Sequence, residues 1–117
     1  MIEVEFSHRE GCLEMTLLGH AGAGPKGQDP VCAAATMLVY TLAQAVRFHQ
    51  EQDQLEAQPR MVLESGAAEI AARPVEDAAA EVMHTFWVVQ AGFYTLAHNY
   101  PACVRLRPMQ IHFQGKE

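Results

Sequence analysis

Apolar and polar residues alternate strictly in two short segments near the N-terminus, residues 2–6 and 13–17. A period of two is typical of strands with one buried face, and the intervening residues 9–11 include a Glu-Gly pair suited to a turn. Two further short segments, 60–64 and 67–72, flank a Ser-Gly pair in the same way. The pattern therefore predicts two β-hairpins.

Two longer segments carry apolar residues at spacings of three and four, which is typical of helices with one buried face. The first runs from about Pro30 to Gln50, and its predicted face consists of Val31, Ala35, Leu38, Leu42, Ala45 and Val46. The second ends before Pro101, and its predicted face consists of Val75, Ala79, Val82, Phe86, Val89, Phe93, Leu96 and Tyr100. A polar linker, 51–58, joins the first helix to the second hairpin.

After the second helix, Arg105 and Arg107 alternate with apolar neighbours, which predicts a last strand with exposed arginines. The predicted order is β-β-α-β-β-α-β. The fold class is then α/β, of the α+β type, with a mostly antiparallel sheet packed with two long helices. At 117 residues, the chain is expected to form one domain over residues 1–117, because a domain of this size buries roughly two-thirds of its unfolded surface.

The formal net charge of −6 at pH 7 argues against a nucleic-acid binder, which needs a basic face, and favours encounter with a basic peptide. The N-terminal segment lacks a charged and then apolar leader, and no uninterrupted apolar run approaches the roughly 20 residues that span a bilayer. Three cysteines, an odd number, favour reduced thiols. We therefore expect a cytoplasmic protein without membrane contact, in which Cys12 and Cys103 are packing residues within strands.

One local arrangement points to chemistry: His20 ends a strand, a glycine-rich loop follows, and Cys32 opens the first helix. Asp is a favoured N-cap and Pro a favoured first helical residue, so Asp29 and Pro30 place Cys32 at the third position of the first turn. Its sulfur is then expected beside unpaired backbone N–H groups and the positive end of the helix dipole, which favour a thiolate. The same N–H groups are expected to hold the oxyanion of a tetrahedral intermediate.

The glycine-rich loop, with Gly22, Gly24 and Gly27, has the freedom to bring His20 back to Cys32 and to close over a bound peptide. A histidine beside a cysteine can take the thiol proton and later protonate a leaving amine. The sequence thus predicts a cysteine acyl-transfer enzyme with Cys32 as nucleophile and His20 as base. Asp29 acts first as a helix cap, and an orienting role for it stays open.

The chain resembles the ribosomal-processing cysteine proteases, the Prp family. The segments that carry the resemblance are Gly19-His20-Ala21, Gly27-Gln28-Asp29 and Val31-Cys32-Ala33-Ala34, and more weakly Asn99-Tyr100-Pro101. The resemblance implies a small homodimeric cysteine endopeptidase that removes the N-terminal extension of a large-subunit ribosomal protein. It also implies His20 and Cys32 as the catalytic dyad. The chain departs from the family pattern at Pro30, where an aliphatic or small residue is common, and at Thr36, where serine is frequent.

Trp87, Val88 and Tyr94 lie off the main apolar face of the second helix. This helix is therefore expected to be covered on two sides, by its own sheet and by further apolar surface. The residues leave open whether that second surface is a partner chain or the core of a monomer. The family resemblance favours a homodimer.

Two other functions stay open. His8, Cys12, His20 and Cys32 offer two nitrogens and two sulfurs, a set that zinc accepts tetrahedrally. The spacing is against zinc, because no C-x2-C pair exists and His8 and Cys12 straddle the predicted turn, so we expect neither a metal nor another cofactor. The second is a non-catalytic, ribosome-associated dimeric scaffold. Reaction of Cys32 with iodoacetamide at neutral pH separates these possibilities from a protease.

Overall fold

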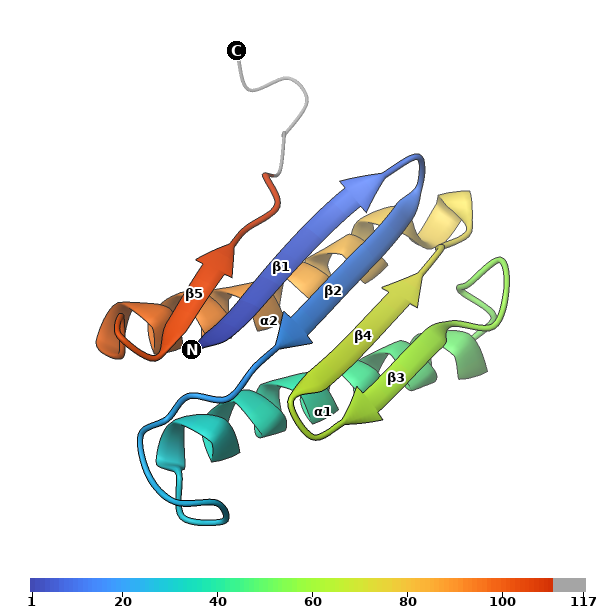
Figure 1. Cartoon of the computed structure of the whole chain (residues 1–117). Coiled ribbons are helices and arrows are strands. Elements are labelled where there is room, and N and C mark those ends of the chain that lie inside the picture. Colours follow the sequence, from blue (N-terminus) through green and yellow to red (C-terminus); the bar gives the residue numbers. More distant parts are fainter. Residues whose placement is uncertain (111–117) are drawn as a thin grey trace.

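The computed structural model describes residues 1–110, and within them one sheet is covered by two long helices (Figure 1). The elements are β1 (Ile2–Arg9), β2 (Cys12–Leu18), α1 (Pro30–Glu51), β3 (Arg60–Glu64), β4 (Ala67–Ala72), the 3-10 helix η1 (Glu76–Ala78), α2 (Ala79–Asn99) and β5 (Val104–Arg107). This order contains every predicted strand and helix. The predicted domain extends to residue 117, so its last seven residues lie outside the described part.

The sheet has the order β3-β4-β2-β1-β5. The two hairpins lie side by side, because β2 pairs with β4 in antiparallel fashion, and β5 joins the other edge parallel to β1. Both helices lie on one face of the sheet, and no helix of residues 1–110 covers the opposite face (Figure 1). The predicted α+β class, with a mostly antiparallel sheet and two helices, is confirmed.

The core forms where the alternating strand residues meet the helices. Ile2, Val4 and Phe6 of β1 are buried as their alternation predicted, and Arg105 and Arg107 of β5 are exposed. The buried face of α1 differs slightly from the prediction and consists of Val31, Ala35, Val39, Leu42, Ala43 and Val46. The difference arises because this helix touches two surfaces. Leu38 turns toward α2, where a Cβ on Gly92 would lie only 2.6 Å from its Cδ2 atom.

The second helix begins later than its apolar spacing predicted. Val75 is in extended conformation (ψ 157°) and caps η1, and the α-helix starts at Ala79. Pro74 forms an isolated bridge with Leu55, and the Val75 N–H donates to the Gln54 carbonyl at 2.9 Å, so this segment is held in extended form before the helix begins. At the other end, Tyr100 lies beyond the helix and is exposed.

The predicted places of two cysteines are corrected. Cys103 lies in the turn before β5 rather than in a strand, where its carbonyl accepts a hydrogen bond from the Ile2 N–H at 2.7 Å. Cys12 begins β2 as predicted, but its side chain lies on the open face of the sheet beside Ser7 and Thr16, outside the core. The alternation along β2 explains this, since Leu13 takes the inward position.

By length and composition alone, helix α1 is long and apolar enough to cross a membrane. A core helix of a globular domain meets the same criterion, and six of its residues pack within the core. In this fold α1 is accounted for by the sheet that it covers.

Candidate active site

The first turn of α1 is built as predicted around Asp29 and Cys32. One carboxylate oxygen of Asp29, Oδ1, accepts hydrogen bonds from the backbone N–H groups of Val31 and Cys32, each at 3.0 Å. Pro30 takes the first helical position, where its missing N–H costs nothing. Cys32 is half-buried in this turn, so its sulfur can be reached from outside.

The same bonds overturn the prediction that these N–H groups are free to hold an oxyanion. The N–H groups of Val31 and Cys32 are occupied by Asp29, and that of Ala33 bonds to the Asp29 carbonyl at 3.0 Å. A strong side-chain cap necessarily competes with any ligand for the same donors. The sulfur instead receives a hydrogen bond from the N–H of Ala21 at 3.3 Å, and this donor stabilises negative charge there.

Asp29 also holds the loop that joins β2 to α1. Its second carboxylate oxygen, Oδ2, accepts from the N–H of Ala23 at 2.9 Å. The pKa of Asp29 is lowered, chiefly by the hydrogen bond from the backbone of Cys32 and further by those from Ala23 and Val31. Because the charged form accepts all three bonds, the carboxylate ties the loop to the helix at neutral pH. No hydrogen bond joins Asp29 to His20 within residues 1–110, so no direct contact supports a role of Asp29 in orienting His20.

His20 is positioned by a neighbour that sequence reasoning missed, the turn between β3 and β4. Leu18 stands opposite Ala67 in the sheet, and the Gly19 N–H bonds to the Gly66 carbonyl at 2.9 Å. Gly66 has a φ of +74°, and a Cβ on it would lie 2.6 Å from the Nε2 atom of His20. The imidazole therefore rests against the bare Cα of Gly66.

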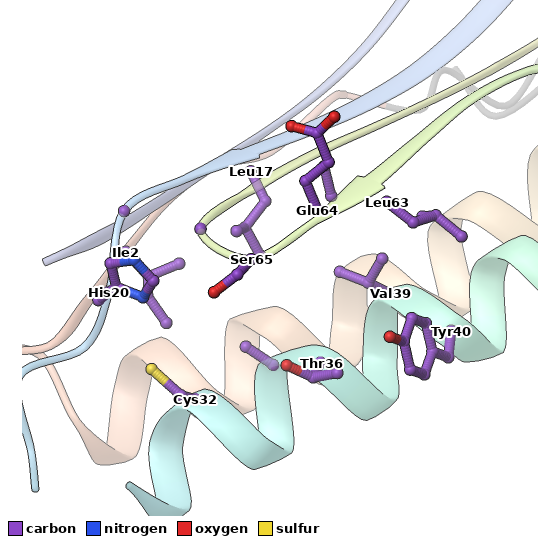
Figure 2. Close-up of a pocket in the computed structure, with 14 residues that line it drawn as sticks. Ile2, Leu17, His20, Cys32, Thr36, Val39, Tyr40, Leu63, Glu64 and Ser65 are labelled. Carbon is purple, nitrogen blue, oxygen red and sulfur yellow. The ribbon is translucent and has the colours of Figure 1, made fainter. Parts of the chain in front are cut away.

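Two cavities meet at this point. The first, about 280 Å³, lies between α1 and the β3–β4 turn and is lined largely by apolar residues, among them Ile2, Leu17 and Val39 (Figure 2). The second, about 500 Å³, is lined by the glycine-rich loop and Asp29. Three residues line both cavities: His20, Cys32 and Ser65. The predicted base and nucleophile thus face one continuous groove, together with a serine that no sequence pattern marked.

The predicted loop glycines all line the second cavity, for two different reasons. Gly22 and Gly27 have φ values of +73° and +83°, a region that disfavours other residues. Gly24 does not share that conformation. It is restricted by space, because a Cβ there would lie 2.8 Å from the carbonyl oxygen of Gln28.

Within the described residues, no hydrogen bond joins the His20 ring to the Cys32 sulfur. Figure 2 shows the sulfur and the ring on the same side of the groove, each on its own element. Catalytic hydrogen bonds are often long in a free enzyme and tighten when substrate binds. The sequence prediction that the loop brings both residues to one cavity agrees with this geometry.

The four proposed zinc ligands do not come together. His8 and Cys12 flank the β1–β2 turn, at the opposite end of β2 from His20 and therefore far from Cys32. Over residues 1–110, no three His, Cys, Asp or Glu side chains form a group suited to a metal ion. The antiparallel pairing of β1 with β2 prevents this zinc site, because His8 and Cys12 lie at the turn of the hairpin and His20 follows its other end.

Comparison with known proteins gives a consistent result. A sequence profile of the family described as Cysteine protease Prp matches residues 1–105. An S. aureus protein, described as an essential ribosomal processing protease Prp with a covalently linked product peptide, has a TM-score of 0.72 and 22% identity, covering 92% of this chain and 99% of that chain. SMU.848 from Streptococcus mutans has a TM-score of 0.65 and 28% identity, covering 94% and 96%. No curated protein matches the chain.

Proposed function

The chain belongs to the Prp cysteine protease family, and from this premise we propose that it is a cysteine endopeptidase with Cys32 as nucleophile and His20 as base. The observation that carries the proposal is the junction of the two cavities. Cys32 and His20 both line it, and a peptide lying along the groove would cross them. A scaffold without activity gives no reason for a cysteine and a histidine to share an open groove.

The proposed reaction is hydrolysis through a thioester. His20 takes the thiol proton, and the Cys32 sulfur attacks the scissile carbonyl to form a tetrahedral intermediate. As the C–N bond breaks, His20 returns the proton to the leaving amine. A water molecule then attacks the thioester, and the thiol is restored. The Ala21 N–H and the dipole of α1 stabilise charge on the sulfur before the attack.

We further propose that the substrate is the N-terminal extension of a large-subunit ribosomal protein. The structurally similar S. aureus protein is described as a ribosomal processing protease, and one of its structures holds a substrate peptide (20% identity, TM-score 0.66, covering 92% of this chain and 99% of that chain). The formal charge of −6 favours a basic partner such as a ribosomal protein. Three unpaired cysteines fit a cytoplasmic setting, which we propose with it.

A homodimer is part of the proposal, and the outer helix face supports it. We use this name for Met37 and Phe48 of α1 and Trp87, Val88 and Tyr94 of α2, which are large, apolar and exposed on the side away from the sheet. Their exposure in the single chain supports a covering partner rather than a position within a monomer core. Glu81 is the only Asp, Glu, Lys or Arg in α2, so two acidic copies can meet here with little repulsion.

The experiment that tests the activity combines the purified protein with the extended ribosomal protein of the same organism and sequences the N-terminus of the product. Cys32→Ala is expected to abolish cleavage with the fold retained. His20→Ala is expected to lower turnover by about 10²- to 10⁴-fold, the usual loss for a positioned base. Cys12→Ala, on the open sheet face, is the matched control and should cleave normally. Retained cleavage in Cys32→Ala would place the nucleophile elsewhere.

A further inference from the structure

Peptide hydrolysis at Cys32 requires a donor for the oxyanion, and the first turn of α1 does not offer one. The oxyanion forms on the carbonyl oxygen when the sulfur attacks, and donors aimed at this position contribute strongly to catalysis. The N–H groups of Val31, Cys32 and Ala33 are already bonded to Asp29. The N–H of Ala21 is bonded to the sulfur itself. We therefore look for the donor among the other groups that line the groove.

Ser65 lies where such a donor is needed. Among residues 1–110 it is the third residue, beside His20 and Cys32, that lines both cavities, so it borders the position where a scissile bond would cross the groove. Figure 2 shows its hydroxyl directed into the pocket, on the side of the His20 ring and the Cys32 sulfur. The other hydroxyl-bearing lining residues, Thr36 and Tyr40, line the first cavity alone.

The Ser65 hydroxyl is also available. Within residues 1–110 no protein group forms a hydrogen bond with it, and the residue is exposed. Its backbone is nevertheless fixed, because Glu64 and Ala67 close the two-residue turn and the Gly66 carbonyl is bonded to Gly19. The backbone therefore fixes the place of the side chain, and the unbonded hydroxyl can turn toward a negative oxygen in the groove.

We propose that Ser65 is a catalytic residue whose hydroxyl donates a hydrogen bond to the oxyanion. This inference rests on the proposed peptidase function. The sulfur–carbon bond forms, the carbonyl π electrons move to oxygen, and Ser65 Oγ–H stabilises the resulting negative charge without transferring its proton. When the oxyanion collapses, the C–N bond breaks and His20 protonates the amine. The serine is unchanged at the end of the cycle.

The test separates attack on a carbonyl from simple reactivity of the thiol. Iodoacetamide alkylates a thiolate by displacing iodide, and no oxyanion forms. Ser65→Ala is expected to lower kcat for a peptide substrate by about 10²- to 10³-fold, with KM within a few-fold. The alkylation rate of Cys32 should equal that of the parent protein. Ser65→Thr keeps a hydroxyl and is expected to recover most of kcat.

Ser7→Ala, which removes a hydroxyl from the open sheet face, is the control and should match the parent protein in both assays. A Ser65→Ala variant that cleaves at the parental rate would overturn the assignment while leaving the peptidase function intact. A variant that loses cleavage and alkylation together would also overturn it, since Ser65 would then act on the thiol or on the fold. If the parent protein cleaves no peptide at all, the proposed function itself fails.

Discussion

At the residue scale, the position of His20 in the groove depends on a glycine, Gly66, that has no side chain. Gly66 lies against the His20 ring with a φ of +74°, and its Cα leaves no space for a methyl group beside Nε2. The candidate base is therefore positioned by close packing on a turn, in addition to its place at the end of β2. This contact limits where the exposed ring can lie on the side of the turn.

Gly66→Ala should lower turnover more than its effect on stability explains. Alanine in the left-handed region costs about 1–2 kcal/mol, and its Cβ, 2.6 Å from the present position of Nε2, would displace the His20 ring. Gly11→Ala is the matched control, because Gly11 has a φ of +80° at the distant β1–β2 turn. Thermal unfolding should show a similar loss in both variants, and peptide cleavage should fall only in Gly66→Ala. Equal activity in the two variants would contradict the packing argument.

At the element scale, the start of α1 and the preceding loop form one unit through Asp29. The carboxylate bonds the helix with one oxygen and Ala23 with the other. If the loop closes over a peptide as predicted, it does so while Ala23 is bonded to the start of α1.

Asp29→Asn should loosen the loop and make stability less dependent on acid pH. The pKa of Asp29 is lowered in the folded protein, so its charged form stabilises the fold above the pKa of the unfolded chain. That stability is lost as pH falls through the folded value. The variant should therefore unfold at a lower temperature than the parent at neutral pH, and the gap should close at strongly acidic pH. Hydrogen exchange over residues 21–28 should be faster in the variant. An equal gap at both pH values would mean that the charge is irrelevant.

The open face of the sheet holds a like-charge pair. The pKa of Glu14 is raised, first by a side-chain hydrogen bond with Glu69, then by burial and by the Glu69 charge. Glu69 in turn bonds to Arg60 at 3.3 Å. Because the folded state holds the Glu14 proton more tightly than the unfolded chain, stability falls as pH rises from the unfolded pKa through the folded one.

Glu14→Gln should consequently raise the melting temperature at neutral pH by about 1–3 °C. Like charges on neighbouring strands cost a few tenths of a kcal/mol, and 1 kcal/mol corresponds to roughly 4–8 °C in a domain of this size. The gain should shrink toward the pH at which Glu14 is protonated in the parent. Glu3→Gln removes a charge paired with Arg105 across strands and should bring no such gain. A pH-independent gain in Glu14→Gln would refute the repulsion.

At the scale of the whole molecule, the groove and the outer helix face are two separate surfaces. Figure 1 shows the β3–β4 turn beside α1 at one end of the sheet, and the residues that line the groove come from these two elements and the chain around them. The outer helix face, defined above, points away from the sheet. A second copy that docks there would leave the groove and the β3–β4 turn uncovered.

Val88→Glu should convert the proposed dimer to a monomer. Val88 is 63% exposed, so the change costs the isolated fold little, and a charge buried in an interface without a partner is strongly unfavourable. Sedimentation velocity at several concentrations measures the result. Leu18→Glu is the matched control, because Leu18 is 64% exposed on the open sheet face, and it should leave the oligomer unchanged. An unchanged dimer in Val88→Glu would place the interface elsewhere.

Local sequence patterns predict the strands, the two helices and the start of α1. Period-two and three-four apolar spacing identified five strands and two helices because each element must bury one face of its own residues, a local requirement. Asp29, Pro30 and Cys32 were assigned correctly for the same reason, since capping depends on neighbours along the chain. His20 and the loop glycines could be selected because their residue types carry chemistry or flexibility.

The surroundings of these residues depend on contacts between segments that are distant along the chain. Ser65 and Gly66 reach His20 because β2 pairs with β4, and this pairing between separate hairpins has no signature in local spacing. The orientation of Leu38 toward Gly92, and the position of Cys12 outside the core, depend likewise on contacts between distant segments. Local periodicity specifies which residues of an element are buried. Packing between elements determines which residues they contact.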